Sequence, residues 1–268
     1  MEHEVFARRQ VLRTLAWAGL AGLEAGSWAP AFAAAPHGPD VNLLPPGSGQ
    51  LAALMRQLAA APRRRDFKTV PMTLTRPDQW DSEAMHEVLH YPSGPKVVWH
   101  NTELAGPWLN LMRLTLNSQI WSFGHPNTLV VSVTHGSASL ALFDQAAWDK
   151  YEFPKLTKGH FKRNVFLDVP PAALALPRSS QNPEGPYSVK ADTVTVLQRR
   201  GVVFLACHDG IWLLAGHLVA KHMAPGKPTQ AEVAADLSDH LIPGVILTPD
   251  VVGELVELEQ AGFVYAHS

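Results

Sequence analysis

Residues 201–210, GVVFLACHDG, decide how the rest of the chain is interpreted. The apolar run at 202–206 is typical of a buried strand, and a helix is predicted from Asp209 onward. Cys207 lies between the two and is the only cysteine in the 268 residues, so it cannot form a disulfide within the chain. Packing, metal ligation and sulfur chemistry are therefore the three roles open to it.

Strand and helix patterns alternate on both sides of this stretch. Strands that alternate with helices predict an α/β fold with a mainly parallel sheet and helices on both faces. Short apolar runs predict strands at 97–100, 128–134, 202–206, 245–248 and 263–265. Helical spacing, a capping box at 229–232 and the breakers Pro249 and Gly262 predict helices at 50–60, 82–89, 107–120, 138–150, 190–200, 209–223, from 229, and from 249 to 262.

The first 33 residues have the pattern of an export signal. Arg8 and Arg9 begin the twin-arginine form RRQVLR, an apolar stretch follows at 14–23, and AFA at 31–33 fits a cleavage site. Residues 1–33 are therefore predicted to be a twin-arginine signal peptide. No later run approaches about 20 apolar residues, so we expect a periplasmic protein with no membrane segment in its mature form.

Two further regions are predicted after the signal. Residues 34–95 are expected to form a proline- and glycine-rich leader and a helical N-terminal extension, in which the basic run at 63–65 lies in solvent. Residues 96–268 are expected to form the α/β domain. An insertion at about 152–187 holds six prolines and is too rich in them for long regular elements. It could be a lid, an interface arm or a passive surface excursion.

Composition excludes some classes of function. The chain has 22 Lys and Arg against 24 Asp and Glu, a net charge of −2, and no basic stripe, so nucleic acid is not an expected partner. A hydrophobic fraction of 46% argues against disorder along its length.

The carboxyl ends of parallel strands meet at one edge of a sheet, where ligands bind. His100 and Asn101 follow the first predicted strand, His135 and Gly136 follow the second, and Cys207 follows the third. Cys207 is the candidate catalytic residue, with His135 or His100 reaching across as its base. Asn101 and Gly136 are candidate binding residues at the same edge.

His208 and Asp209 are further candidate binding residues, and they affect the thiol in different ways. A helix that begins after Cys207 would stabilise a thiolate, whereas the charge of Asp209 would raise the pKa of the thiol. The sequence leaves the net direction open. Adjacent residues on an extended chain face opposite sides, so His208 is not expected to pair with Cys207 merely because it is next in sequence.

Metal ligation has no specific signature here. The 13 histidines do not form an H-E-x-x-H, C-x-x-C or C-x-x-C-H pattern, so no metal and no cofactor is predicted. A metal site built from Cys207 with His100, His135 or His208 remains an alternative.

The ordered motifs resemble the DsrE/DsrF/TusD-like family of sulfur-relay proteins. The resemblance covers about residues 96–266, without the insertion, and rests on six stretches taken in order. They are KVVWH at 96–100, LNLMRL at 109–114, VVSVTHG at 130–136, GVVFLAC at 201–207, LIPGVILTP at 241–249 and LEQAGFVYA at 258–266.

The resemblance implies a flavodoxin-like sheet and assembly into homo-oligomers, either trimers or hexamers. It also implies that Cys207, at the position of the family's sulfur-accepting cysteine, receives sulfane sulfur from a donor as a persulfide and relays it to an acceptor. A non-catalytic oligomeric binding or assembly module is the alternative, because the chain has eight tryptophans and the proline-rich insertion.

Overall fold

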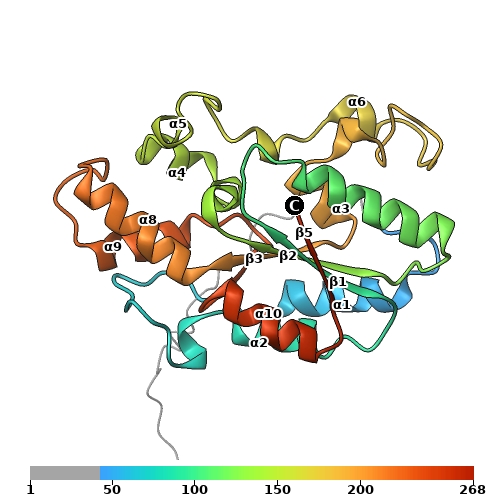
Figure 1. Ribbon diagram of the computed structural model, residues 1–268, viewed down its shortest axis with the longest axis horizontal. Coiled ribbons are helices and arrows are strands. Elements are labelled where there is room, and N and C mark those ends of the chain that lie inside the picture. Colours follow the sequence, from blue (N-terminus) through green and yellow to red (C-terminus); the bar gives the residue numbers. More distant parts are fainter. Residues whose placement is uncertain (1–42) are drawn as a thin grey trace, which may run out of the picture. The chain divides into compact units, whose positions relative to one another are not determined.

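The computed structural model describes residues 43–268 (Figure 1). The predicted signal peptide at 1–33 and the start of the leader lie outside the described residues. Among the helices that are described, none is both long enough and apolar enough to cross a membrane.

Within residues 43–268 the centre of the fold is a five-stranded sheet in which every neighbouring pair is parallel. The strands are β1 (Lys96–Asn101), β2 (Leu129–Thr134), β3 (Val203–Cys207), β4 (Ile246–Thr248) and β5 (Val264–His267). The parallel sheet with helices on both faces is thus confirmed, with strand ends close to those predicted.

The strand order is β4-β3-β2-β1-β5. The chain crosses the sheet in sequence from β1 to β4 and then returns to place β5 beside β1. Flavodoxin itself has the order 2-1-3-4-5, so this chain shares the flavodoxin-like layers while its last strand occupies the outer position beside β1.

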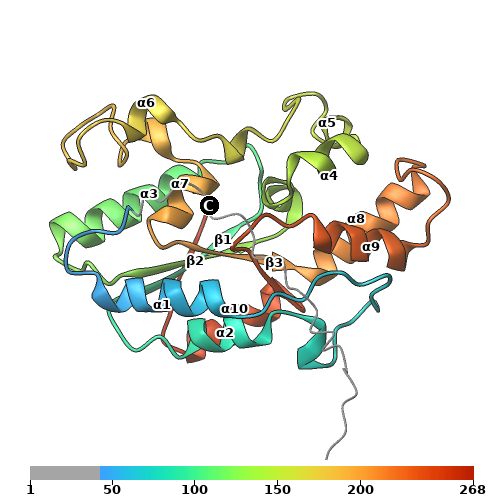
Figure 2. The ribbon, with the colours of Figure 1, turned by 180° about the vertical axis from the view of Figure 1, so that it is seen from behind.

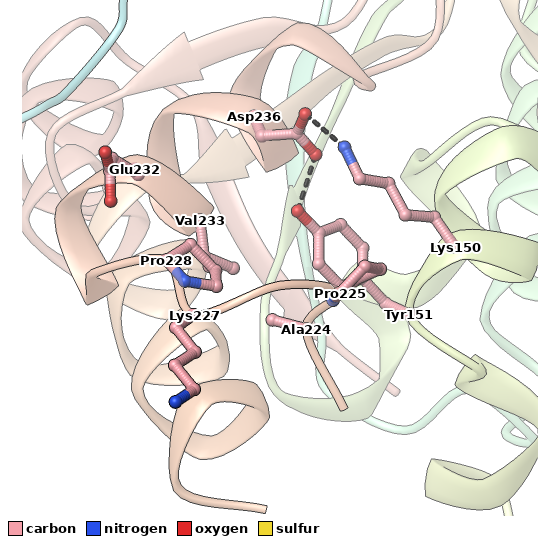
Figure 3. A pocket seen from close by; sticks show the side chains of 9 residues that line it. All are labelled: Lys150, Tyr151, Ala224, Pro225, Lys227, Pro228, Glu232, Val233 and Asp236. Carbon is pink, nitrogen blue, oxygen red and sulfur yellow. Dashed lines mark hydrogen bonds and ion pairs between the residues drawn. The ribbon is translucent and has the colours of Figure 1, made fainter. Parts of the chain in front are cut away.

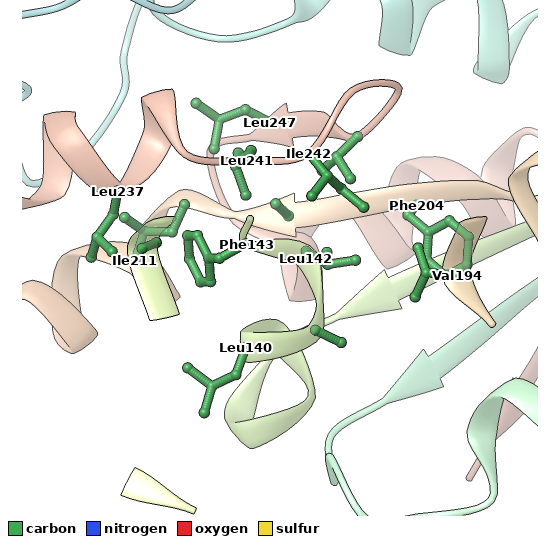
Figure 4. Close-up of a cluster of buried hydrophobic side chains, with 14 of the residues drawn as sticks. Leu140, Leu142, Phe143, Val194, Phe204, Ile211, Leu237, Leu241, Ile242 and Leu247 are labelled. Atoms are coloured by element: carbon green, nitrogen blue, oxygen red, sulfur yellow. The ribbon is translucent and has the colours of Figure 1, made fainter. Parts of the chain in front are cut away.

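One face of the sheet is covered by the helices that connect β1 to β4 (Figures 1 and 2). They are α3 (Trp108–Asn117), α4 (Gln145–Lys150), α7 (Val194–Arg199), α8 (His208–Ala220) and α9 (Gln230–Asp239). Their apolar residues pack with those of the sheet in the larger core, part of which Figure 4 shows around Phe143, Phe204 and Leu237. Thr229 and Glu232 form the predicted capping box at the start of α9.

The opposite face is covered by α1 (Gly49–Ala60), α2 (Ser82–Leu89) and α10 (Val251–Gln260) (Figure 2). Leu51, Leu54 and Met85 pack with Val131, Leu205 and other residues of the sheet in a second core. The described part of the predicted N-terminal extension is therefore part of a layer of the same fold, which it shares with α10, the helix that contacts β2 and β3.

Two predicted helices are each divided. Residues 138–150 form a 3-10 helix (Gly136–Leu142) and then α4, because Phe143 is extended and bridges to Leu241, and Asp144 caps a new helix. Residues 190–200 form a 3-10 turn (Val189–Ala191) and then α7, because the Thr193 side chain accepts a hydrogen bond from the Val196 N–H. Helical spacing alone did not reveal these internal caps.

The insertion at 152–187 contains only short helical segments in its described length, as predicted: α5 (Phe153–Leu156), a 3-10 turn (Val165–Leu167) and α6 (Pro171–Leu174). It lies over the helices of the first face (Figure 1). Phe153 is fully buried, and the Asn164 side-chain amide donates to the carbonyls of Ala141 and Phe143 at 3.1 and 2.7 Å. The insertion is therefore anchored to this layer at several points.

The expectation that the basic run at 63–65 lies in solvent is wrong. Arg64 is half-buried and forms an ion pair with Glu83. Arg63 and Arg65 are half-buried and form ion pairs with Asp81, which is fully buried. Asp81 in turn binds the edge strand β4: its N–H donates to the Leu247 carbonyl at 3.0 Å, and its carboxylate accepts the Leu247 N–H at 2.8 Å. Arg63 and Arg65 are thus counterions for a carboxylate that pairs with an edge strand.

Candidate functional site

The strand exits carry the candidate residues at one edge of the sheet. His100 and Asn101 end β1, His135 and Gly136 follow β2, and Cys207 ends β3. In register, Asn101 lies beside Thr134 and Thr134 lies beside Ala206. The positions that follow, His135 and Cys207, therefore continue two neighbouring strands at the same level.

Cys207 is the last residue of β3 and the N-cap of α8. Its side chain belongs to the core between the sheet and α10, and 6% of the residue is exposed. The sulfur accepts the Gly210 N–H at 3.2 Å, and the S–H donates to Oδ1 of Asp250 at 3.6 Å. The groups that contact this thiol thus lie at the first turns of helices, because Asp250 is the N-cap of α10.

Opposing effects act on the pKa of this thiol, and the direction left open by the sequence is upward. Burial is the largest cause and raises the pKa of Cys207, and the charges of Asp250 and Asp209 raise it further. Hydrogen bonds from the N–H groups of Val251 and Gly210 lower the pKa without reversing the shift. The thiol therefore stays protonated at neutral pH.

Three carboxyl groups accompany Cys207, and we call this set the thiol half of the site: Cys207, Asp209, Asp250 and Glu254. Burial, followed by the charge of Asp250, raises the pKa of Asp209. Glu254 is only 8% exposed, its Oε2 has no hydrogen-bond partner, and burial with the charges of Glu257 and Asp250 raises its pKa to about 7. The thiol half is acidic and poorly solvated.

His208, a predicted binding residue, is directed away from this set. Its imidazole is fully buried, and Nε2 lies 2.8 Å from the carbonyl oxygen of Pro71, to which it donates. Burial lowers the pKa of His208, so the ring is neutral at neutral pH. Its contact is with the segment that leads to α2, and we assign it to the packing of that segment.

His100 and His135 are brought together as the sequence suggested. Their Nε2 atoms are 2.7 Å apart, and their ring planes are within 13° of parallel, with 4.9 Å between centroids. Nδ1 of His100 lies 3.0 Å from the phenol oxygen of Tyr265, and the ring of Tyr265 lies 6.2 Å from that of His267. We call His100, His135, Tyr265 and His267 the histidine half of the site.

Asn101 and Gly136 shape the strand exits. The Asn101 side chain is buried and donates to the Ser132 hydroxyl at 2.8 Å, while its oxygen accepts the Ser268 hydroxyl at 2.9 Å. Gly136 has φ of +58°, and a Cβ there would lie 2.8 Å from the Thr102 carbonyl oxygen. Both residues hold the backbone on which His100 and His135 are carried, and neither has a free side-chain group to offer a ligand.

The two halves are adjacent but not bonded to each other. Among the described residues, no hydrogen bond joins Cys207 to His100 or His135. Strand β2 separates β1 from β3, which places the backbones of His100 and Cys207 roughly 10 Å apart. His135 is closer because it follows the strand next to β3.

Sequence reasoning missed four members of these halves: Asp250, Glu254, Tyr265 and His267. Asp250 had a usable signal, since an Asp after Pro249 at a predicted helix start is a typical N-cap, and this strand exit was expected at the same edge. Tyr265 and His267 belong to the last strand, whose position beside β1 depends on the strand order and cannot be derived from local pattern.

The metal alternative receives no support from the described residues. Within residues 43–268 no group of three or more His, Cys, Asp or Glu side chains is arranged to hold a metal ion. Cys207 and His208 have separate partners, and Cys207 has no bond to either of the other two histidines proposed as ligands.

The hollow surfaces described for this chain lie away from both halves. The larger has a volume of about 450 Å³ and is lined by α4, α9 and the loop before α9 (Figure 3). In its wall, Lys150 and Tyr151 both donate to the carboxylate of Asp236, so these polar groups already have partners within the protein. A smaller one of about 250 Å³ lies beside Trp108 and Phe166. Neither contains a candidate site residue.

Comparison of the chain with protein-family models, with curated proteins and with solved structures finds no match, so the family resemblance stays a prediction from the motifs.

Proposed function

We propose that the protein is a sulfur-trafficking protein of the DsrE-like kind, which accepts sulfane sulfur on Cys207 and passes it to an acceptor thiol. One observation carries the proposal: the sulfur of Cys207 lies between the first turns of α8 and α10, with the carboxylate of Asp250 at 3.6 Å. A thiol held beside a base and beside helix N–H groups is equipped for nucleophilic chemistry.

Asp250 has a defined role in this proposal. Since burial keeps the thiol protonated, attack needs a base, and Asp250 already accepts the S–H. The carboxylate takes the proton as Sγ attacks the outer sulfur of the donor. One S–S bond forms, the donor's bond to that sulfur breaks, and the leaving group departs with the bonding electron pair. No external oxidant or reductant is required.

The persulfide would carry its negative charge on the outer sulfur. Helix N-termini stabilise anions, and the first turns of α8 and α10 both adjoin Cys207. The acceptor's thiolate then attacks the outer sulfur, and Cys207 leaves and regains a proton from Asp250. In this reading the protein is a sulfur carrier with sulfurtransferase activity and works without a cofactor, in the periplasm if residues 1–33 act as a twin-arginine signal.

The proposal is tested by treating the full chain with thiosulfate or polysulfide and measuring the mass of intact protein. We expect one added sulfur atom, located on Cys207 by peptide mapping and removed by a thiol acceptor. Cys207→Ser should gain none. An unmodified Cys207 with both donors, in protein whose thiol reacts with iodoacetamide after denaturation, would exclude a sulfur-accepting role.

Asp250→Asn keeps a side chain that can cap α10 and removes the base. We expect its sulfur uptake to be slower at neutral pH and to recover as the pH rises and the thiolate forms without help. Asp149→Asn, an exposed carboxylate on α4, is the matched control and should behave as the wild type.

Self-assembly is supported by a different observation. Among the described residues, strand β5 pairs on one side only, with β1. Val264 and Tyr265 on this strand are 67% and 43% exposed. An exposed apolar edge strand pairs readily with another chain, so we propose that the protein forms a homo-oligomer, a trimer or hexamer, that uses this edge. Light scattering of the wild type and of Val264→Lys tests it: an unchanged mass in the variant would exclude this edge.

A further inference from the structure

The histidine half contains two imidazoles that must share a proton. His100 Nε2 and His135 Nε2 are 2.7 Å apart, a distance at which one of the two nitrogens donates and the other accepts. The Tyr265 hydroxyl at 3.0 Å from Nδ1 of His100 can donate to that nitrogen, which leaves the proton of His100 on Nε2. In the neutral pair, Tyr265 therefore donates to His100, and His100 donates to His135.

The pair can also hold one extra proton without losing this contact. With three protons on four ring nitrogens, both Nδ1 atoms carry one and the third remains between the Nε2 atoms. Nδ1 of His100 then donates to the Tyr265 oxygen, which can accept as well as donate. A fourth proton would place two N–H groups against each other and break the contact. The pair can therefore hold a single positive charge while its contact is kept.

No acidic side chain of the described residues neutralises that charge. The ion pairs that involve histidine within residues 43–268 all belong to His240, on the other face of the sheet. The charges acting on His100 are those of His135 and His267, and with burial they lower its pKa.

The other acidic groups on this side of the sheet form no ion pair with these imidazoles in the described chain. On α10, Asp250 accepts the S–H of Cys207, and Glu254 is a buried carboxyl whose ionised form is disfavoured by burial and by the charges of Glu257 and Asp250. On the β5 side, Ser268 donates through its N–H to the His100 carbonyl. A half-buried cation without a protein counterion favours an anion from outside.

We propose that the His100–His135 pair binds a small oxyanion, and specifically the sulfonate end of a thiosulfate-class sulfur donor. The second half of this inference rests on the proposed function of Cys207. The thiol half is acidic and cannot attract a dianion, so the donor's charge needs a cationic group nearby, and His135 follows the strand next to β3. The sulfane sulfur would face Cys207, and sulfite would leave with the electron pair of the broken S–S bond at the imidazoles.

Binding that brings a proton to the pair must depend on pH. One proton taken up per anion changes the affinity by as much as about tenfold per pH unit wherever the free pair is neutral. Sulfate and thiosulfate should therefore bind more tightly at pH 6 than at pH 8. Calorimetry of the full chain in buffers that differ in ionisation enthalpy should show proton uptake at pH 7 with either anion.

His135→Gln leaves no site for the shared proton, and we expect loss of the pH dependence and at least about tenfold weaker binding of both anions at pH 6. Tyr265→Phe removes one hydrogen bond and should weaken binding less. His160→Gln, an exposed histidine in the insertion, is the control. Equal affinity of His135→Gln and wild type, or no proton uptake, would overturn the inference. Weaker binding shared by His160→Gln would do the same, since it would indicate diffuse charge.

The two proposals fail in different ways. Cys207→Ser should bind sulfate and thiosulfate as the wild type does, because the anion site does not use the thiol. If wild-type Cys207 gains no sulfur while the anions still bind with proton uptake, only the sulfur chemistry is excluded. If Cys207 gains sulfur from thiosulfate at the same rate in His135→Gln, only the role of the pair in binding the donor is excluded.

Discussion

The thiol half and the histidine half occupy one edge of one sheet, and they keep their protons by opposite means. Cys207 is isolated from water, and its proton stays first because burial disfavours the thiolate and then because the charges of Asp250 and Asp209 oppose a further negative charge. His100 and His135 are partly solvated and lack an acidic partner in the described chain, so they share a proton between themselves. The electrostatic character of a strand exit is thus set by which helix or strand flanks it, α10 at one and β5 at the other.

The largest effect is expected at Glu254, where burial acts without compensation. A carboxyl whose pKa rises from 4.5 unfolded to about 7 folded destabilises the protein once it ionises. This destabilisation is absent below pH 4.5, grows between pH 4.5 and 7, and amounts to roughly 3 kcal/mol above pH 7. Glu254→Gln should remove most of this pH dependence.

Urea unfolding at pH 5 and pH 8 measures how the free energy of unfolding changes with pH. Glu259→Gln, at an exposed position of the same helix, is the control. Wild type should lose stability between these pH values relative to Glu254→Gln. If wild type and Glu254→Gln lose the same stability, Glu254 is solvated and the thiol half is not isolated from water.

The next effect tests how rigidly the histidine half is held. Gly136 has φ of +58°, and a Cβ would lie 2.8 Å from a backbone oxygen, so Gly136→Ala should lower the free energy of unfolding by about 2 kcal/mol or more. Gly124→Ala is the matched control, with φ of +74° and no atom within 4 Å of the added Cβ, and should cost about 1 kcal/mol. Equal costs would mean that the β2 exit adapts, and then His135 is not fixed beside His100.

The smallest effect is expected at Asp209, whose charge acts less strongly on the Cys207 thiol than the charge of Asp250 does. Its charge is the last of the causes that raise the pKa of Cys207. Asp209→Asn should therefore lower that pKa slightly and speed alkylation by iodoacetamide at pH 8 severalfold at most, with Asp149→Asn unchanged. A slower reaction would show that access, rather than charge, limits the thiol.

Much of the fold could be predicted because each strand is a short apolar run and each connection carries its own breakers. The strand that ends in Cys207 and the capping box at Thr229 are local signals and were found in place. The divided helices were not predicted, because the breaks depend on the bridge between Phe143 and Leu241 and on the side chain of Thr193.

For the site, sequence reasoning identified the residues at strand exits but could not identify their neighbours. His100 and His135 were expected at one edge because that follows from parallel strands alone. The raised pKa of Cys207 was not predictable, because it depends on how deeply α10 packs over β3 and on where Asp250 and Glu254 then lie. Likewise, Tyr265 meets His100 only because the chain returns from β4 to the outer side of β1.

The pairing of Asp81 with both hydrogen-bonding groups of Leu247 has a consequence for polymerisation. A sheet with two free edges can add copies at both ends and grow without limit, as cross-β fibres do. Here Asp81 and its arginines occupy the middle of the β4 edge, so a strand from another copy can add only at β5. Edge-to-edge pairing at β5 joins two copies about a twofold axis, so in a hexamer this edge would link two trimers, which are held together by other surfaces. Loss of the Asp81 carboxylate should therefore show first as a tendency to form filaments, before any loss of the site.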